Sequence, residues 1–131
     1  MSEWRYPSVE DLVCDLLERE LDEDVYIGTW EPPVGSEFVA SVLVSNTGGG
    51  EYDGTSYPTV DIHVESDTRR AVRLVCSHIR KVLDNIRGKS VNDVLVDDVE
   101  PLRLPAQYRG VNDSTRTEVM SFQLTFRKQF F

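Results

Sequence analysis

The fold is decided by the stretch TVDIHVESDTRRAVRLVCSHIRKVLDNIRG, Thr59 to Gly88, in which the hydrophobic period changes from that of a strand to that of a helix. Ser66 or Asp67 can cap the helix, and Gly88 stands where a left-handed residue commonly ends one. The inward residues are Val60, Ile62 and Val64 of the strand, then Ala71, Val72, Val75, Ile79, Val82, Leu83 and Ile86 of the helix. We therefore expect a half-buried strand that leads directly into a long amphipathic helix.

A second amphipathic helix is predicted before this stretch, from Ser8 to Leu21. Ser8, with Asp11 three residues later, forms an acceptable capping box after Pro7. The apolar residues again recur at helical spacing, at Val9, Leu12, Val13, Leu16, Leu17 and Leu21. The acidic run from Asp22 to Asp24 ends this pattern.

The remaining apolar segments have the composition or the alternation of strands. They are Val25–Trp30, Phe38–Ser45, a segment around Val94–Val96, and Arg116–Arg127 with Met120, Phe122, Leu124 and Phe126 inward. Pro101 to Ser114 contains two prolines and is expected to be a loop. The predicted order is α-β-β-β-α-β-β within one domain, residues 1–131. Because both helices have one apolar face, we predict an α+β two-layer sandwich, with a mostly antiparallel sheet and both helices on one face.

A glycine-rich segment, residues 46–58, separates two of these strands and contains Gly48, Gly49, Gly50 and Tyr52. So many glycines oppose a packed conformation, and we expect a long, mobile hairpin tip that contacts a partner. The three glycines do not form a phosphate-binding loop, because no Lys-Ser/Thr pair and no helix follow them directly.

Size and charge limit the possible functions. The 131 residues leave room for one core, and no stretch approaches the ~18 apolar residues of a membrane helix. The start resembles no secretory signal, so we expect synthesis and residence in a cytoplasm. The formal net charge of −9 opposes tight binding to DNA phosphates, although an acidic surface would let DNA slide past. Cys14 and Cys76 are expected to be half-buried thiols.

Only one group of residues in the sequence suggests a metal site or catalysis: Asp61, His63 and Glu65. They share one strand face with side chains ~7 Å apart, and two carboxylates with an imidazole can bind a divalent metal. That spacing is wide for one ion, so we interpret these residues as a solvated strand face. His78 is expected on the surface. Since no catalytic signature occurs elsewhere, we predict a non-enzymatic protein without a cofactor.

Charge separates the two predicted helices. Between Ser8 and Asp24 there are eight acidic residues and one basic residue, whereas Asp67 to Lys89 contains seven basic and two acidic residues. These charges can balance each other within one subunit. Alternatively, the acidic surface of one subunit meets the basic surface of the next and closes a ring. The residues assigned to this hypothetical subunit interface are Asp15, Glu18, Asp22, Arg69, Arg70 and Arg73.

The whole layout resembles the tail-terminator and head-tail neck, or tail-completion, proteins of long-tailed bacteriophages. The resemblance spans nearly the entire chain and is carried by YPSVEDLV (6–13), VYIGTWEPP (25–33), the glycine-rich tip, TVDIHVE (59–65) with its helix, and the closing strand from Arg116 to Phe130. It implies a virion protein, assembled in the host cytoplasm, that forms a hexameric ring without catalysis. The ring would cap the tail tube and contact the head connector, with DNA only passing through its lumen.

Other functions remain open at this point. Another neck, tail-completion or head-tail adaptor protein would share the same size and α+β composition. A small metal-dependent enzyme would use Asp61, His63 and Glu65, and metal analysis of the purified protein would identify it. A monomeric adaptor that binds charged partners would be distinguished from a ring by its mass in solution.

Overall fold

A computed structural model describes residues 4–5, 8–30, 37–52, 54–108, 116–127 and 129–130. Along the chain lie β1 (Trp4–Arg5), α1 (Val9–Glu20), β2 (Val25–Gly28), β3 (Ala40–Tyr52), β4 (Thr55–Ser66), α2 (Arg69–Asn85), β5 (Lys89–Val91), β6 (Val94–Tyr108), β7 (Arg116–Arg127) and β8 (Gln129–Phe130). Both helices, and all the strands that the sequence predicts, are present. The short strands β1, β5 and β8 were not predicted.

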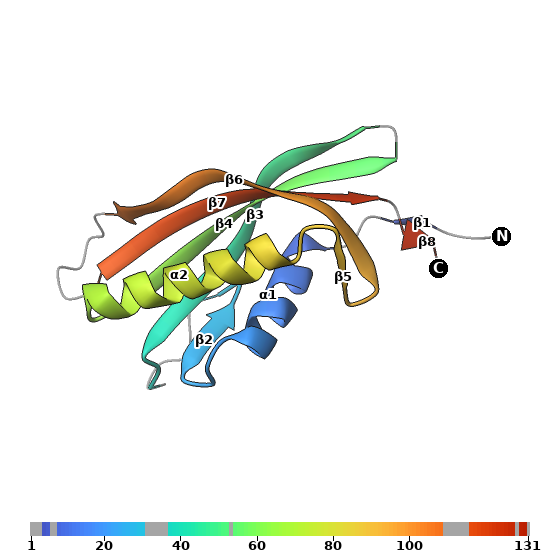
Figure 1. Cartoon of the computed structure of the whole chain (residues 1–131). Coiled ribbons are helices and arrows are strands. Elements are labelled where there is room, and N and C mark those ends of the chain that lie inside the picture. Colours follow the sequence, from blue (N-terminus) through green and yellow to red (C-terminus); the bar gives the residue numbers. More distant parts are fainter. Residues whose placement is uncertain are drawn as a thin grey trace.

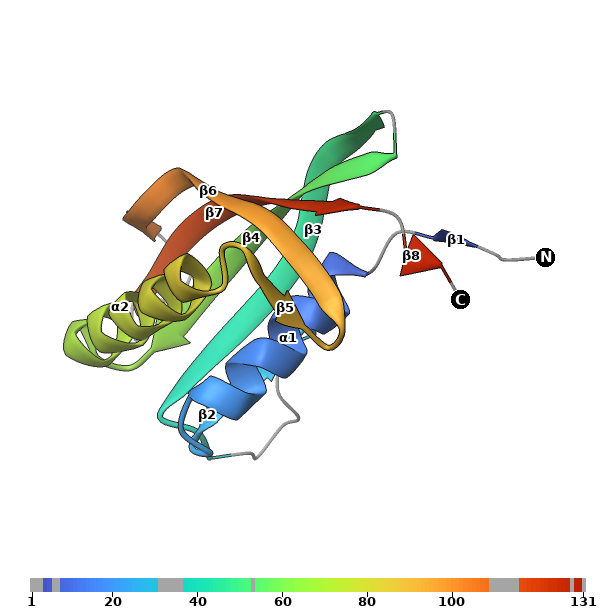
Figure 2. The same ribbon diagram turned by 45° about the vertical axis from the view of Figure 1, so that its right-hand side comes forward.

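The main sheet has the order β2-β3-β4-β7-β6-β5, and β1 pairs separately with β8. Every pair in the main sheet is antiparallel except β2 with β3, which run parallel. The sheet curls like half a barrel, so that α1 lies between β2 and β5 (Figure 1; Figure 2). The α+β class is therefore confirmed, but the flat, two-layer sandwich is wrong, because the sheet is mixed and curled.

Helix α1 begins as predicted at Ser8, whose side-chain Oγ accepts a hydrogen bond from the Asp11 amide at 3.4 Å. Helix α2 begins one or two residues later than expected. Thr68 is its cap, and the Thr68 Oγ1 accepts a hydrogen bond from the Ala71 amide at 3.2 Å. Gly88 has a φ of +76°, the left-handed conformation predicted for it.

The core lies between the two helices and one face of the sheet. Val60, Ile62 and Val64 are fully buried, as are the inward residues of β7 from Met120 to Phe126. The stripe of α2 differs in one respect from the prediction: Cys76 is buried, whereas Ala71 and Val75 are only partly buried. The stripe is thus rotated slightly, toward β7.

Strands extend into two segments that were expected to be a mobile hairpin tip and a loop. β3 and β4 continue through the glycine-rich segment, with Tyr52 opposite Thr55, and form a projecting hairpin (Figure 1). β6 continues through Pro101 to Tyr108, whereas residues 109–115 lie outside the described part. β5 pairs with β6 only as far as Val96, so beyond this residue the outer edge of β6 forms no hydrogen bonds with β5. Proline is tolerated there because its missing N–H removes no hydrogen bond between strands. Among the described residues, no helix is long and apolar enough to cross a membrane.

Candidate subunit-interaction site

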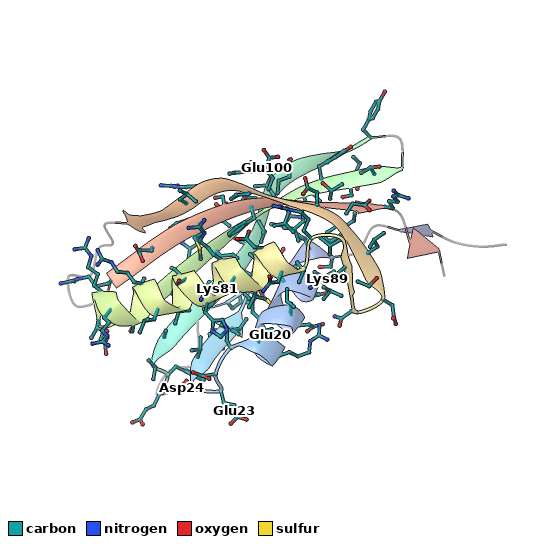
Figure 3. The ribbon with its side chains drawn as sticks, in the orientation of Figure 1. Glu20, Glu23, Asp24, Lys81, Lys89 and Glu100 are labelled. Atoms are coloured by element: carbon teal, nitrogen blue, oxygen red, sulfur yellow. The ribbon has the colours of Figure 1, made fainter. Side chains whose placement is uncertain are left out.

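Helix α1 and the turn after it form an exposed acidic surface. It consists of Asp11, Asp15, Glu18, Glu20, Asp22, Glu23 and Asp24. Asp15, Glu18 and Arg19 line a shallow hollow of about 310 Å³ with Asn92, whose Nδ2 donates to the Asp15 Oδ2 at 3.1 Å. Glu23 and Asp24 point away from the body of the protein (Figure 3). This acidic surface is open to a partner along its whole length.

Helix α2 carries the opposite charge on its exposed side. Arg69, Arg70, Arg73 and Lys81 are exposed there and form the basic surface. Arg69 and Arg70 occupy the first turn, which contains no acidic residue. The partial positive charge of a helix N-terminus makes that turn an unfavourable place for cations. Helix stability does not explain these arginines, so their position favours a role in binding.

Two arginines of the basic surface make no ion pair with the acidic surface. In the described part of the chain, the ion pairs for which distances are known join Arg87 to Asp98 at 2.9 Å and Arg127 to Asp97 at 3.1 Å. These pairs connect β6 with β7 and with the turn that follows α2. Neither Arg70 nor Arg73 has an ion pair with a described residue. For these two arginines, the alternative of internal charge balance therefore lacks direct contacts.

A second hollow, the α2 hollow, lies beside this helix and was not predicted. It has a volume of about 300 Å³ and is lined by Arg73, Cys76, Ser77, Arg80, Lys81, Asp84 and Glu118. The Glu118 Oε2 is buried and has no hydrogen-bond partner among the described residues. Burial, the charge of the neighbouring Glu118 carboxylate and a side-chain hydrogen bond with Glu118 raise the pKa of the Cys76 thiol to about 12. The signal was present in the sequence, because Glu118 is in phase with the inward residues Met120 and Phe122.

The glycine-rich hairpin, here called the arm, comprises residues 46–52 of β3, Gly54 of the turn and residues 55–58 of β4. Its β3 strand is exposed throughout, and the Tyr52 side chain near the tip is 77% exposed. β2 pairs with β3 only as far as Leu43. Beyond that point, the outer edge of β3 has no strand partner in the described structure and includes Gly48, Gly49 and Gly50. Such an edge can accept a strand from another chain.

Among the suspected metal ligands, Asp61 has structural partners. Asp61 Oδ1 accepts hydrogen bonds from the Ser121 Oγ at 2.6 Å and from the Thr47 Oγ1 at 3.3 Å. Asp61 therefore links β3, β4 and β7 on the face away from the helices. Among the described residues, no group of three or more His, Cys, Asp or Glu side chains could hold a metal ion. Asp61, His63 and Glu65 thus do not form the site that a metal-dependent enzyme would require.

Comparison with known proteins gives one informative result. No family model matches the sequence, and no curated protein matches it. Among solved structures, a chain from the virion of a native gene transfer agent particle superposes with a TM-score of 0.65. The two chains share a fold. The likeness covers 91% of this chain and 94% of that chain, at 12% sequence identity, so the architecture extends over almost the whole of both molecules.

Proposed function

We propose that this chain is a structural, non-enzymatic protein of a phage-like virion, located in the tail or neck. The observation that carries the proposal is the fold shared end to end with a chain from a gene transfer agent virion. The sequence layout independently resembles tail-terminator and neck proteins. In its most specific form, the proposal is therefore a ring that caps the tail tube and meets the head connector. The second candidate function is another neck or tail-completion role.

The opposed charges of the helices support a head-to-tail ring. The acidic surface contains Asp15, Glu18 and Asp22, and the basic surface contains Arg69, Arg70 and Arg73. When two different surfaces of one subunit meet, the contact repeats around an axis and can close into a ring. A net charge of −9 fits a lumen through which DNA moves without binding.

The mass of the purified protein in solution tests this proposal. Light scattering after size-exclusion chromatography should show a species of six 14.9-kDa chains at high protein concentration, and electron microscopy should show rings. A chain that stays monomeric at every concentration, at both low and moderate salt, would contradict the ring. Metal analysis is the matched test of the enzyme alternative, which predicts close to one bound metal per chain.

A further inference from the structure

Trp30 is an anchored but exposed aromatic residue. Its side chain is 82% exposed, more than any other large hydrophobic residue that the structure describes. The Tyr26 hydroxyl donates a hydrogen bond to the Trp30 carbonyl at 2.8 Å, and the Tyr26 ring packs on Phe38 with centroids 5.4 Å apart. The hydrogen bond ties the Trp30 carbonyl to β2, while the residue itself is exposed to solvent. Tryptophan is enriched among the few residues that dominate protein interfaces.

The surroundings of Trp30 are both apolar and acidic. Val39 is 53% exposed, and its amide donates a hydrogen bond to the carbonyl of Asp24 at 2.8 Å. Phe38, itself 40% exposed, therefore lies close to the acidic turn that follows α1. Trp30, Phe38 and Val39 together form what we call the knob. A partner for the knob needs apolar surface with positive charge beside it.

Strand β6 pairs with β7, the strand that supplies Glu118 to the α2 hollow, and carries exposed apolar residues. The pairing of β6 with β7 is interrupted by irregularities between Pro101 and Arg103 and between Arg103 and Ala106. Leu102 and Leu104 lie within these irregularities. The two leucines are 52% and 57% exposed.

The chemistry of the α2 hollow matches an indole. Arg73 and Arg80 supply guanidinium groups, which attract the face of a tryptophan ring. The Glu118 Oε2 is a buried acceptor without a donor, and an indole has one N–H to donate. Leu102 and Leu104 offer apolar contact to the rest of the knob. The basic surface beside the hollow complements the acidic turn beside the knob.

We propose that the Trp30 knob of one copy inserts into the α2 hollow of the next copy, where the indole N–H binds Glu118. The inference rests on the proposed ring and names the contact that holds it. Within one subunit the two sites cannot meet, since Trp30 follows β2 at one margin of the sheet and the hollow lies on the β6 side of α2. The contact is therefore heterologous, as a closed ring requires.

Tryptophan fluorescence provides the first test. The chain has two tryptophans, so Trp4→Phe leaves Trp30 as the only reporter. In dilute monomer, its emission should be that of a solvated indole, open to quenching by iodide. On assembly, the emission should shift to shorter wavelength and the quenching should fall. Rings that form while Trp30 stays fully quenchable would overturn the inference and leave the proposed ring intact.

Complementation of two variants provides the second test. Trp30→Ala removes the knob, and Ser77→Phe fills the α2 hollow, which Ser77 lines. Both residues are exposed, so folding should be kept. Each variant alone should self-associate at least about tenfold more weakly than wild type. An equimolar mixture retains one intact contact and should give heterodimers only.

The control for these variants is Leu95→Ala, which truncates an exposed hydrophobic residue outside the knob, the α2 hollow and the arm. It should form rings like wild type. If Trp30→Ala also assembled like wild type, the knob would not hold the ring, although the ring itself would stand. A wild-type protein that never associates would overturn both the inference and the proposed function.

Discussion

Glu118 occupies a position on β7 at which the alternation of the strand calls for an apolar side chain. Met120, Phe122, Leu124 and Phe126, in the same phase, are buried in the core. A carboxylate oxygen that is buried without a donor costs free energy, so such a residue is rarely retained for stability alone. The sequence interpretation began the inward face at Met120 and passed over this residue, which is now central to the proposed contact.

Gly49 is the glycine on which the arm depends. Its φ is +104°, and a Cβ at this position would lie 2.0 Å from the backbone carbonyl oxygen of Tyr57. Gly49→Ala should therefore lower the free energy of unfolding by more than about 1 kcal/mol, measured by urea denaturation. Gly50→Ala is the matched control, because a Cβ there meets nothing within 4 Å. Equal effects of the two substitutions would contradict this role of Gly49.

The two cysteines should make stability fall at alkaline pH. Burial, assisted by Glu18, raises the pKa of Cys14 from 9.0 to about 11, and burial with Glu118 raises that of Cys76 to about 12. Above pH 9 the unfolded chain loses thiol protons that the folded chain retains, so this contribution to stability declines from pH 9 toward pH 11. Urea denaturation of wild type and of Cys14→Ala/Cys76→Ala at pH 8 to 10.5 checks this. The wild type should show the steeper decline, and parallel curves would exclude the effect.

At the scale of elements, the sequence predicted what local patterns determine. α1, α2 and β7 were found nearly residue by residue, because their apolar spacing and caps are encoded within each segment. The β5–β6 hairpin was missed, although Asn92 and Asp93 both adopt positive φ, at +52° and +62°, as tight hairpins require. An Asn-Asp pair between apolar runs was the available signal.

Other features depended on contacts between distant segments. The parallel pairing of β2 with β3 and the curl of the sheet arise from packing around α1, which no single stretch encodes. The same holds for the candidate site. The charges of the two helices were evident in the sequence, whereas the α2 hollow needs Glu118 of β7 beside Arg73 and Arg80 of α2. Sequence reasoning thus found the charged surfaces but not the α2 hollow.

Reversing the charge of α2 should weaken assembly without loss of fold. The triple variant Arg69→Glu, Arg70→Glu and Arg73→Glu has acidic residues near the N-terminus of α2. Each acidic residue there stabilises a helix by at most about 0.3–1 kcal/mol. Thermal denaturation should therefore show a folded protein, while light scattering shows weaker ring formation at low salt. The loss should diminish as salt rises, because each exposed pair contributes only ~0–1 kcal/mol and is screened.

A reciprocal swap is the control for this prediction. A second triple variant, Asp15→Lys, Glu18→Lys and Asp22→Lys, reverses the charge of the acidic surface. Alone, this variant should also associate poorly. Mixed with the reversed α2 chains, they should form mixed assemblies through the swapped contact. If neither reversal changed assembly at low salt, both charged surfaces would be ordinary solvated faces.

At the scale of the whole molecule, the curled sheet separates the surfaces that a ring must bring together. β2 forms one edge of the main sheet, whereas β6 and β7 lie beyond β4 on the other side (Figure 2). The acidic turn and the knob belong to the β2 side, and the α2 hollow belongs to α2 and β7. One subunit therefore carries two different, complementary contact sites. The arm projects from the same sheet and belongs to neither site (Figure 1).

The arm should become protected only on assembly. Its β3 strand pairs with β4 on one side, while its outer edge is open and its side chains are exposed. Few contacts thus oppose opening, and ordering costs about 1–2 kcal/mol of backbone entropy per residue, most of all at glycines. Hydrogen exchange of residues 46–52 should be fast in the monomer and slow in the ring, whereas core strand β7 should be protected in both. If the arm were equally protected in both states, a neighbouring subunit would not be what orders it.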